Sequence, residues 1–418
     1  MIERDHAIAQ DGADVLAVFR DRFMVDDETI YLDGNSLGRL PMATIERLRT
    51  VVEDEWGKGL VGSWSRWVEL AGAVGDRIAE ALLGAGPGEV VLADSTTVNL
   101  YKAASAALDA RPESRLVVTD RHNFPTDRYV LEGLCAARGR ELRLVEVDEV
   151  EGPQPDDVAR ACAGGDVALV VLPHVDFRSG ALADMPAITD LAHRAGAVML
   201  WDVCHSVGSV PVDLEGSGAE LAVGCTYKYL NAGPGAPAFI YARRTFQRLG
   251  WRQPIWGWFG QRDQFEMGPR YTPADGIGAW VSGTPPVLGM AAVQEGVELL
   301  AAAGVDRLRA KSLRLTELVI DLFDDWLAPL GFRLSSPRSS HHRGGHVAIG
   351  HPLAWPLCQA LIDRHHVVPD FRPPDVLRLG PAAAYTRFID VWDGVDRLRQ
   401  AVEADHWKDY PEKPSRVT

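Results

Sequence analysis

The sequence has little of what marks a secreted or membrane-spanning protein. Its 418 residues include only five cysteines, which are scattered and form no Cys-x-x-Cys pair, so neither a disulfide framework nor a zinc site is expected. It has no apolar run of about 18 residues, the length needed to span a bilayer. Its polar N-terminus does not resemble a signal peptide. We therefore expect a soluble, cytoplasmic protein with no membrane partner.

Positive charge is also scarce. Lys and Arg number 43 against 58 Asp and Glu, which gives a formal net charge of −15. Because no run of basic residues offsets this balance, nucleic acid is not expected as a partner. Hydrophobic residues make up 46% of the chain and charged residues 24%, which are values typical of a globular protein with a large core. The expected partner is a small molecule.

Short apolar segments alternate with helix-like segments between residues 90 and 241. The apolar segments are residues 90–93, 116–119, 142–147, 167–172, 197–201, 221–224 and 238–241. Several are apolar at consecutive positions, as strands buried on both faces are, and this predicts a mostly parallel, seven-stranded sheet. Helices are expected between the strands, for example at 98–108 and 185–195. This alternation predicts a doubly wound α/β domain.

The flanking segments predict a second, smaller α/β domain. Two helical stretches are expected near the N-terminus, at 12–23 and 43–55, and the chain beyond residue 285 is helical to residue 327 before it becomes mixed. A chain of this length usually forms more than one domain. We expect a large domain at 60–290 and a discontinuous small domain made of 1–59 and 291–418.

Two charged residues follow predicted strands, where ligands of open α/β sheets bind. Asp202 ends the strand at 197–201, and a buried carboxylate needs a cationic partner. Lys228 follows the strand at 221–224 and lies between two tyrosines. Alone, Asp202 could bind a ribose or a metal, and Lys228 could be a solvated surface residue. Together, a Schiff-base lysine and an aspartate that holds a pyridinium nitrogen meet the two requirements of a pyridoxal phosphate site.

Two other strand ends fit the same cofactor. Thr96 and Thr97 begin a predicted helix whose free N–H groups suit a phosphate, although Ser95 or Thr96 could simply cap that helix. Phe124 could stack on a cofactor ring or pack in the core. His205 follows Asp202 closely, but no cluster nearby has the spacing of metal ligands. No metal is expected.

These motifs resemble those of the kynureninase family, which are fold-type-I pyridoxal phosphate enzymes of tryptophan catabolism, in the kynurenine pathway towards NAD. The similar stretches run in pieces from Tyr31 to about Trp392 and read DGNSLGRLP, STTVNLYK, NFPTD, WDVCHSVGSVPVDL, GCTYKYLNAGPGAPAF, GWFG and PDFRPPDVLRLG. The resemblance implies hydrolytic Cβ–Cγ cleavage of L-kynurenine, or 3-hydroxykynurenine, to anthranilate, or 3-hydroxyanthranilate, and L-alanine. It also implies a homodimer with active sites at the interface.

The resemblance further implies a role for individual residues. Lys228 is the lysine that binds the cofactor and acts as the base, Asp202 holds the pyridine nitrogen, and Tyr227 is a phosphate ligand and proton donor. Other implied cofactor contacts are Thr96, Thr97, Phe124, Thr126, Asp127 and His205, with Trp258 and Thr284 supplied by a second subunit. Implied substrate contacts are Arg378 for the α-carboxylate and, for the aromatic ring, Trp64 and Phe259.

Three places depart from the family pattern. Gln261 stands where His is expected, Pro173 where a hydroxyl residue is common, and Ala383 and Ala384 where a bulkier pair is expected. These changes leave the choice between kynurenine and 3-hydroxykynurenine open. Two alternatives remain: another fold-type-I activity, such as a β-lyase, desulfurase or aminotransferase, and a catalytically silent protein that binds pyridoxal phosphate.

Overall fold

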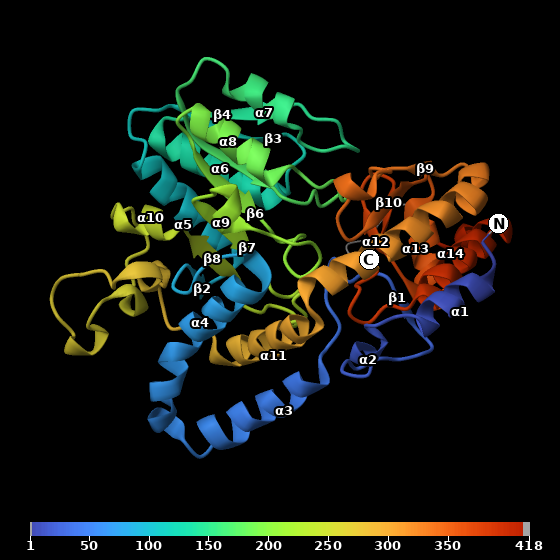
Figure 1. The fold of residues 1–418 in the computed structure, drawn as a ribbon, viewed down its shortest axis with the longest axis horizontal. Helices are drawn as coiled ribbons and strands as arrows, with labels where there is room; N and C mark the ends of the chain where they lie inside the picture. Colours follow the sequence, from blue (N-terminus) through green and yellow to red (C-terminus); the bar gives the residue numbers. More distant parts are fainter. Residues whose placement is uncertain (1, 413–418) are drawn as a thin grey trace.

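The computed structural model describes residues 2–412, and the seven apolar segments form one sheet in it (Figure 1). In spatial order the strands are β2 (Val90–Leu92), β8 (Phe239–Ala242), β7 (Leu221–Gly224), β6 (Val198–Asp202), β5 (Val167–Pro173), β3 (Leu116–Asp120) and β4 (Glu141–Val145). Neighbouring strands from β7 to β4 run parallel, and β8 runs antiparallel to both of its neighbours. The prediction of a mostly parallel α/β sheet is therefore confirmed.

The register of the sheet brings Asp202 to its carboxyl edge. Pro173 on β5 pairs with Asp202 on β6, and Asp202 pairs with Val223 on β7. Every residue of β5, β6 and β7 is buried, which explains why these strands are apolar at consecutive positions. Asp202 ends β6 at this edge, and the loop that follows β7 brings Lys228 to the same region of the molecule.

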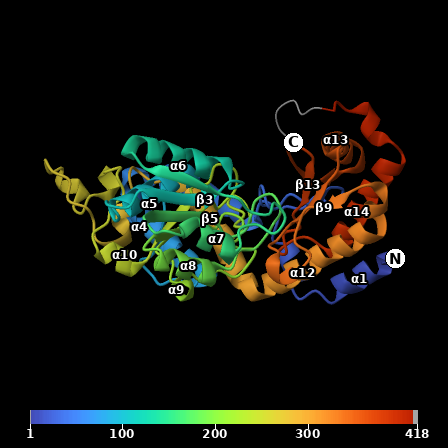
Figure 2. The same cartoon turned by 90° about the horizontal axis from the view of Figure 1, so that it is seen from above.

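Helices lie on both sides of the sheet, with α6 on one side and α8 and α9 on the other (Figure 2). The helices of this part of the chain are α4 (Trp64–Ile78), α5 (Thr96–Asp109), α6 (Pro125–Arg138), α7 (Pro155–Cys162), α8 (Met185–Arg194), α9 (Leu214–Ser217) and α10 (Arg244–Arg248). The helices expected at 98–108 and 185–195 correspond to α5 and α8. Short helical turns flank α4 at η2 (Leu60–Ser63) and η3 (Ala79–Leu83).

The N-terminal segment packs with the C-terminal third of the chain, as the blue and red parts of Figure 1 show. A four-stranded antiparallel sheet has the order β12 (Asp370–Arg372), β13 (Val376–Leu379), β10 (Val347–Gly350) and β9 (Arg333–Leu334). The parallel pair β1 (Ile30–Tyr31) and β11 (Val367–Val368) joins the two segments. The helices around them are α1 (Arg4–Gly12), α2 (Ala17–Arg20), α13 (Ala354–His365) and α14 (Phe388–Glu403), with short turns η7 (Phe323–Leu327), η8 (Ala328–Leu330), η9 (Ser340–His342) and η10 (His406–Asp409).

The helix expected at 12–23 is wrong in its bounds, because α1 ends at Gly12 and α2 covers only Ala17–Arg20. Asp14 lies between them. Its carboxylate accepts the backbone N–H of Leu16 at 2.9 Å and pairs with the buried Lys311 at 2.6 Å. A side chain that bonds the nearby backbone in this way competes with a continuous helix.

The elements form two groups: the seven-stranded sheet with its helices, and the four-stranded sheet with the N-terminal and C-terminal helices. Two helices run across the boundary between these groups: α11 (Val287–Ala303) and α12 (Val305–Leu322). Helix α3 (Met42–Thr50) packs along α11 and continues into the turn η1 (Val51–Trp56). Within residues 2–412 no single helix is long and apolar enough to cross a membrane; the bent pair Val287–Ala303 and Val305–Leu330, with 80° between its halves, meets that test by length and composition alone.

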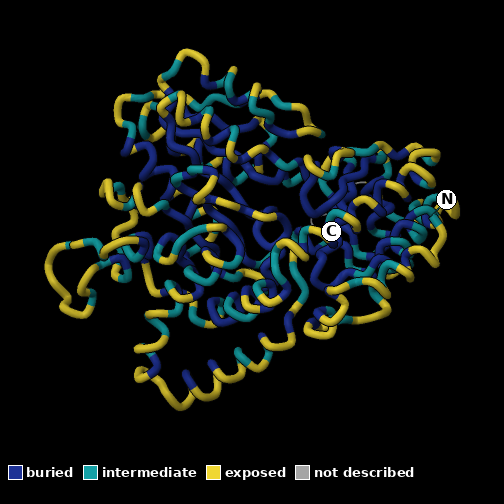
Figure 3. The backbone as a smooth tube through the Cα atoms, in the orientation of Figure 1, coloured by how far each residue is buried: buried dark blue, intermediate teal, exposed yellow. Residues whose placement is uncertain are grey.

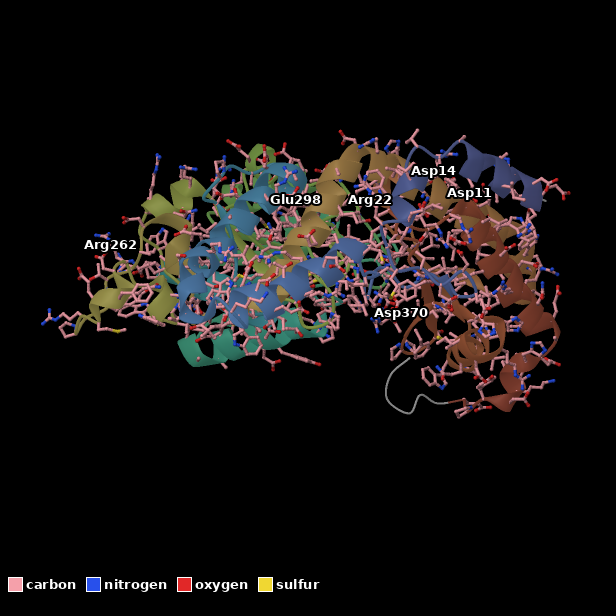
Figure 4. All side chains as sticks on the ribbon, turned by 90° about the horizontal axis from the view of Figure 1, so that it is seen from below. Asp11, Asp14, Arg22, Arg262, Glu298 and Asp370 are labelled. Carbon is pink, nitrogen blue, oxygen red and sulfur yellow. The ribbon has the colours of Figure 1, made fainter. Side chains whose placement is uncertain are left out.

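A loop that we call the projecting segment, residues 255–275, extends away from the sheet in two perpendicular views (Figures 1 and 2). It contains η4 (Trp258–Gly260) and η5 (Gln264–Glu266), and η6 (Gly276–Trp280) follows it. Most of this loop is exposed (Figure 3), and Arg262 lies towards the left end of the molecule in Figure 4. Its apolar side chains are exposed as well, with Phe265 66% and Met267 71% accessible.

Candidate active site

A cavity of about 190 Å³ lies at the carboxyl ends of β5, β6 and β7. It gathers residues from several strand ends that are far apart in the sequence. Its lining residues are Ser95, Thr96, Thr97, Asn123, Phe124, Thr126, Asp127, Pro173, Val175, Phe177, Asp202, Cys204, His205, Tyr227 and Lys228. The structure therefore brings together all the cofactor-binding residues that we expected from a single chain.

The hydroxyl groups at one wall are held by the start of α5. Ser95 caps this helix by accepting the N–H of Val98 at 3.4 Å. Before it, Asp94 has a φ of 42° and pairs with the buried Lys102, whose Nζ also donates to the Trp280 carbonyl at 2.8 Å. This ion pair, in which only the lysine is fully buried, holds the sharp turn between β2 and α5, and the first turn of the helix faces the cavity.

The amine of Lys228 lies in the middle of the site. Its Nζ is 2.9 Å from Nε2 of His205 and 5.9 Å from the ring centres of both Phe124 and Tyr227. Burial and the nearby charge of Lys228 hold the pKa of His205 well below its usual value. His205 is therefore neutral, and its Nε2 shares a hydrogen bond with the lysine amine. Its Nδ1 is buried without a hydrogen-bond partner among the described residues.

The N-terminal segment fixes the backbone beside this lysine. Gly38, in the DGNSLG motif, donates its N–H to the Tyr227 carbonyl at 2.8 Å. A Cβ on Gly38 would lie 2.3 Å from the carbonyl oxygen of Lys228. Only glycine permits so close an approach of two backbones. The DGNSLG motif therefore contacts the backbone of the loop that carries Tyr227 and Lys228, which we call the lysine loop, and does not itself line the cavity.

Two carboxyl groups lie on the same side of the cavity. Asp202 accepts the backbone N–H of Cys204 at 2.8 Å. Asp127 is 1% accessible, and its Oδ2 has no hydrogen-bond partner within residues 2–412. Burial, and then the adjacent charge of Asp202, raise the pKa of Asp127 well above its usual value. Asp127 therefore holds a proton more readily than an ordinary carboxyl group, since two charged carboxylates this close together would repel each other.

The donors in the cavity fit pyridoxal phosphate. Hydroxyls at a helix N-terminus suit a phosphate, a buried carboxylate suits a protonated ring nitrogen, and a lysine amine suits an aldehyde. The unpartnered polar atoms of Asp127 and His205 indicate that the cavity is built for a polar ligand, because buried polar groups are normally hydrogen-bonded. No group of three or more His, Cys, Asp or Glu side chains in residues 2–412 is arranged to hold a metal ion.

Arg378 lies next to this cavity without lining it. On β13 it pairs across the hairpin with Asp370 of β12, and both side chains are buried. The guanidinium also donates to the Phe177 carbonyl and to Ser36 Oγ, the latter at 3.1 Å. Figure 4 shows Asp370 where the two groups of elements meet. Arg378 therefore reaches the active-site region by way of Phe177.

The remaining expected residues form a separate aromatic group. The Trp64 ring centre is 6.1 Å from that of Phe259, and Phe259 is 5.3 Å from Trp258. Phe259 lines a different cavity, of about 780 Å³, beside the projecting segment. Thr284 is exposed outside the site. Within one chain, none of these four residues lines the cavity that holds Lys228.

Reasoning from the sequence missed four residues that line the cavity: Asn123, Val175, Phe177 and Cys204. Phe177 meets Phe124 edge to face with ring centres 5.2 Å apart. Asn123 donates to Thr119 Oγ1 at 3.1 Å and so holds the start of the NFPTD loop. Phe177 comes four residues after the end of β5, so a longer search past each strand end would have found it. Asn123 stands inside a motif that had already been recognised.

Comparison with known proteins gives a consistent result. The family model described as kynureninase C-terminal domain matches residues 308–398, and the model described as aminotransferase class-V matches residues 30–350. A kynureninase from Pseudomonas fluorescens is 43% identical over 415 residues, covering 97% of this chain and 97% of that protein. A kynureninase from Burkholderia pseudomallei (strain 1106a) is 42% identical over 414 residues, covering 98% and 97%.

Solved structures with a similar fold are more distant in sequence. A cysteine desulfurase from Thermococcus onnurineus NA1 has a TM-score of 0.79 at 18% identity and covers 93% of this chain and 98% of its own. A variant of C-DES with glycine covalently linked to its PLP cofactor has a TM-score of 0.79 at 17% identity, covering 91% and 98%. At such low identity these structures support the fold alone.

Proposed function

The chain belongs to the kynureninase family, and from that premise we propose that it is a pyridoxal phosphate-dependent hydrolase that cleaves the Cβ–Cγ bond of L-kynurenine. Water is consumed, and the products are anthranilate and L-alanine. The observation that carries the proposal is the meeting of Lys228 and Asp202 in one cavity of a chain that is 43% identical to a kynureninase over nearly its full length. A comparison of kynurenine with its 3-hydroxy derivative as substrates decides which of the two the enzyme prefers.

The residues of the cavity would hold the cofactor by its distinct groups. Thr96, Thr97 and Tyr227 offer hydroxyls to the phosphate, Asp202 offers a carboxylate to the ring nitrogen, and Phe124 offers a ring face. When bound, pyridoxal phosphate supplies an electron sink for negative charge at the α-carbon of an amino acid. Asp202 would keep a proton on the ring nitrogen, which that chemistry requires.

Lys228 and Tyr227 would move protons. The Lys228 amine, next to the neutral His205, takes the proton from the substrate α-carbon and can return it. Burial raises the pKa of Tyr227 above its usual value, so its hydroxyl stays protonated and can act as a donor to the β-carbon when the Cβ–Cγ bond breaks. Arg378 would hold the α-carboxylate, since its guanidinium lies against Phe177 at the cavity wall and has the planar geometry that a carboxylate needs.

We also propose that the active enzyme is a homodimer and that the chain divides into domains at 60–290 and at 1–59 with 291–418. Exposed aromatic and apolar side chains of the projecting segment support an interface there, because large exposed apolar patches mark contact surfaces. Trp258 and Thr284 would then reach the cavity of the second subunit. Trp64 and Phe259 would contact the substrate ring beside that interface.

A cysteine desulfurase activity is the nearest alternative on the same fold, and the thiols argue against it. All five cysteines are buried. Cys204 does line the cavity, but its contact with Cys225 and its burial raise the pKa of its thiol well above the usual value. A buried thiol that stays protonated is a poor nucleophile. An aminotransferase could use the same cofactor contacts, so only the products separate it from a hydrolase.

The test is product analysis. The enzyme loaded with pyridoxal phosphate is incubated with L-kynurenine or 3-hydroxykynurenine, and the aromatic acid and L-alanine are quantified together. The proposal expects the two products in equal amounts without any added keto acid. Turnover that needs a keto acid, or that releases sulfide from cysteine and no aromatic acid from either kynurenine, would contradict it.

A further inference from the structure

A second cavity, of about 570 Å³, opens beside the active-site cavity and has a strongly basic lining. We call it the basic cleft. Its lining residues are Arg121, His122, Asn123, Phe124, Pro125, Arg128, Phe177, Arg178, Arg372 and Pro373. It contains four arginines and no acidic residue, in a chain whose net charge is −15. The charged side chains that line it are therefore opposite in sign to the net charge of the protein.

The arginines of the cleft are not all neutralised from behind. Arg121 pairs with Glu146, and Arg372 lies 3.3 Å from Asp370. Asp370 also pairs with Arg378, however, so one carboxylate serves two guanidinium groups. The Arg372 side chain is 34% accessible, and apart from Asp370 it bonds only the Phe371 carbonyl, at 3.4 Å. Arg178 is partly buried, and its charge acts on the buried Asp176, to which its backbone N–H also donates, but its guanidinium forms no ion pair within residues 2–412. Two guanidinium groups at this cleft thus keep N–H donors for an anion.

The remaining contacts do not cancel this charge. Arg128 donates Nε–H to the carbonyl of Asn123 at 3.1 Å, and its charge acts on Asp120, whose pKa is raised by burial to about 7. Nε2 of His122 is 3.8 Å from the carboxylate of Glu149. Because this carboxylate is largely exposed, solvent and salt screen its charge. The cleft therefore favours a ligand that carries negative charge.

The cleft and the active-site cavity share a wall. Asn123, Phe124 and Phe177 line both of them, and the two phenylalanine rings meet edge to face between them. Phe124 is 40% accessible, so its ring has an open face. A ligand in the cleft would meet aromatic and proline surfaces together with guanidinium donors, which is the chemistry that an aromatic carboxylate requires.

We propose that the basic cleft is a binding subsite for a small aromatic carboxylate, namely the product of the reaction, held by Arg178 and Arg372. This rests on the proposed function for the identity of the ligand. An amino-acid substrate fits the cleft less well, because its ammonium group would be repelled by the same guanidinium groups that attract its carboxylate. The released aromatic acid has no such ammonium group, and it is produced on the other side of the Phe124–Phe177 wall.

The test is a direct binding titration of the holoenzyme with anthranilate, with benzoate and with benzamide as its uncharged counterpart. Arg178→Gln and Arg372→Gln are compared with Arg115→Gln, a control that removes the same charge at an exposed pair with Asp166 near the opposite end of β3. Each cleft variant is expected to weaken anthranilate and benzoate binding about 10-fold, the scale of one charge-assisted hydrogen bond. The control should bind as the parent does, and benzamide should bind weakly to all of them.

Three results would overturn the proposal: unchanged anthranilate binding in both cleft variants, an equal loss in the control, or a rise in KM for kynurenine with unchanged anthranilate binding. The third result would mean that the arginines of the cleft bind the carboxylate of the substrate rather than that of the product. Because anthranilate binding is measured without turnover, the proposed subsite and the proposed reaction are tested independently of each other. Weakened binding in the cleft variants of a protein that does not cleave kynurenine would sustain the subsite and refute the proposed function.

Discussion

Replacing Asp370 with Asn is expected to destabilise the protein strongly, because Asp370 and Arg378 form an ion pair in which the two side chains are 2% and 1% accessible. Removing one partner of such a pair leaves a buried charge without compensation and costs about 3–5 kcal/mol. Arg378 keeps its bonds to Ser36 and to the Phe177 carbonyl. We therefore expect a loss at the lower end, about 3 kcal/mol. Arg378→Met should also destabilise the protein, because Asp370 would keep only its longer pair with Arg372, at 3.3 Å.

The double variant should cost much less than the sum of the single ones, because it leaves neither charge alone. Urea denaturation of the four apo proteins, followed by far-UV circular dichroism, measures the coupling, which we expect to exceed about 2 kcal/mol. Arg115→Gln with Asp166→Asn provides an exposed comparison pair, for which about 0–1 kcal/mol is expected. Losses that add within about 0.5 kcal/mol at Asp370 and Arg378 would refute the reasoning.

Three further predictions concern the surroundings of the site. Gly38→Ala should abolish most turnover while the far-UV spectrum is retained, since its Cβ would lie 2.3 Å from the Lys228 carbonyl oxygen; normal kcat/KM would show that the lysine loop tolerates the shift. Burial raises the pKa of Asp33 to about 7, so its charge destabilises the fold increasingly as pH rises from about 4 to 7. Asp33→Asn should remove that decline and gain up to about 4 kcal/mol above pH 7 in urea titrations, whereas parallel pH profiles of parent and variant would contradict it. Tyr227→Phe should lower kcat about 100-fold with cofactor absorbance retained, and an unchanged kcat would remove Tyr227 as the proton donor.

The sheet could be predicted from the sequence because burial on both faces leaves a direct mark. The strands from β5 to β7 are apolar at consecutive positions, and this pattern located them within two residues. The rule that ligands bind at the carboxyl ends of strands then singled out Asp202 and Lys228. The positions of the strands and the choice of these two residues depend only on the local sequence pattern and on the direction of the strands, which a parallel sheet fixes.

Other features depend on contacts between distant segments and left no local signal. Asp370 is an ordinary aspartate in the sequence, and only the hairpin register places it opposite Arg378. The need for glycine at position 38 arises from a contact with the Lys228 loop, which is far away in the chain. The helix expected at 12–23 is interrupted by the bonds of Asp14, one of which reaches Lys311. Such effects are set by tertiary structure rather than by periodicity.

The central claim is that Lys228 carries the cofactor and the chemistry of kynurenine hydrolysis. In the most direct test, the enzyme loaded with pyridoxal phosphate is reduced with borohydride, and the pyridoxyl label is located by peptide mass spectrometry. Kynurenine turnover is then compared in Lys228→Ala and in a control, Lys58→Ala, which removes an exposed lysine paired with Asp54. We predict a label on Lys228, loss of turnover in its variant and full activity in the control. A label on another lysine, or anthranilate release at the parent rate by Lys228→Ala, would contradict the account.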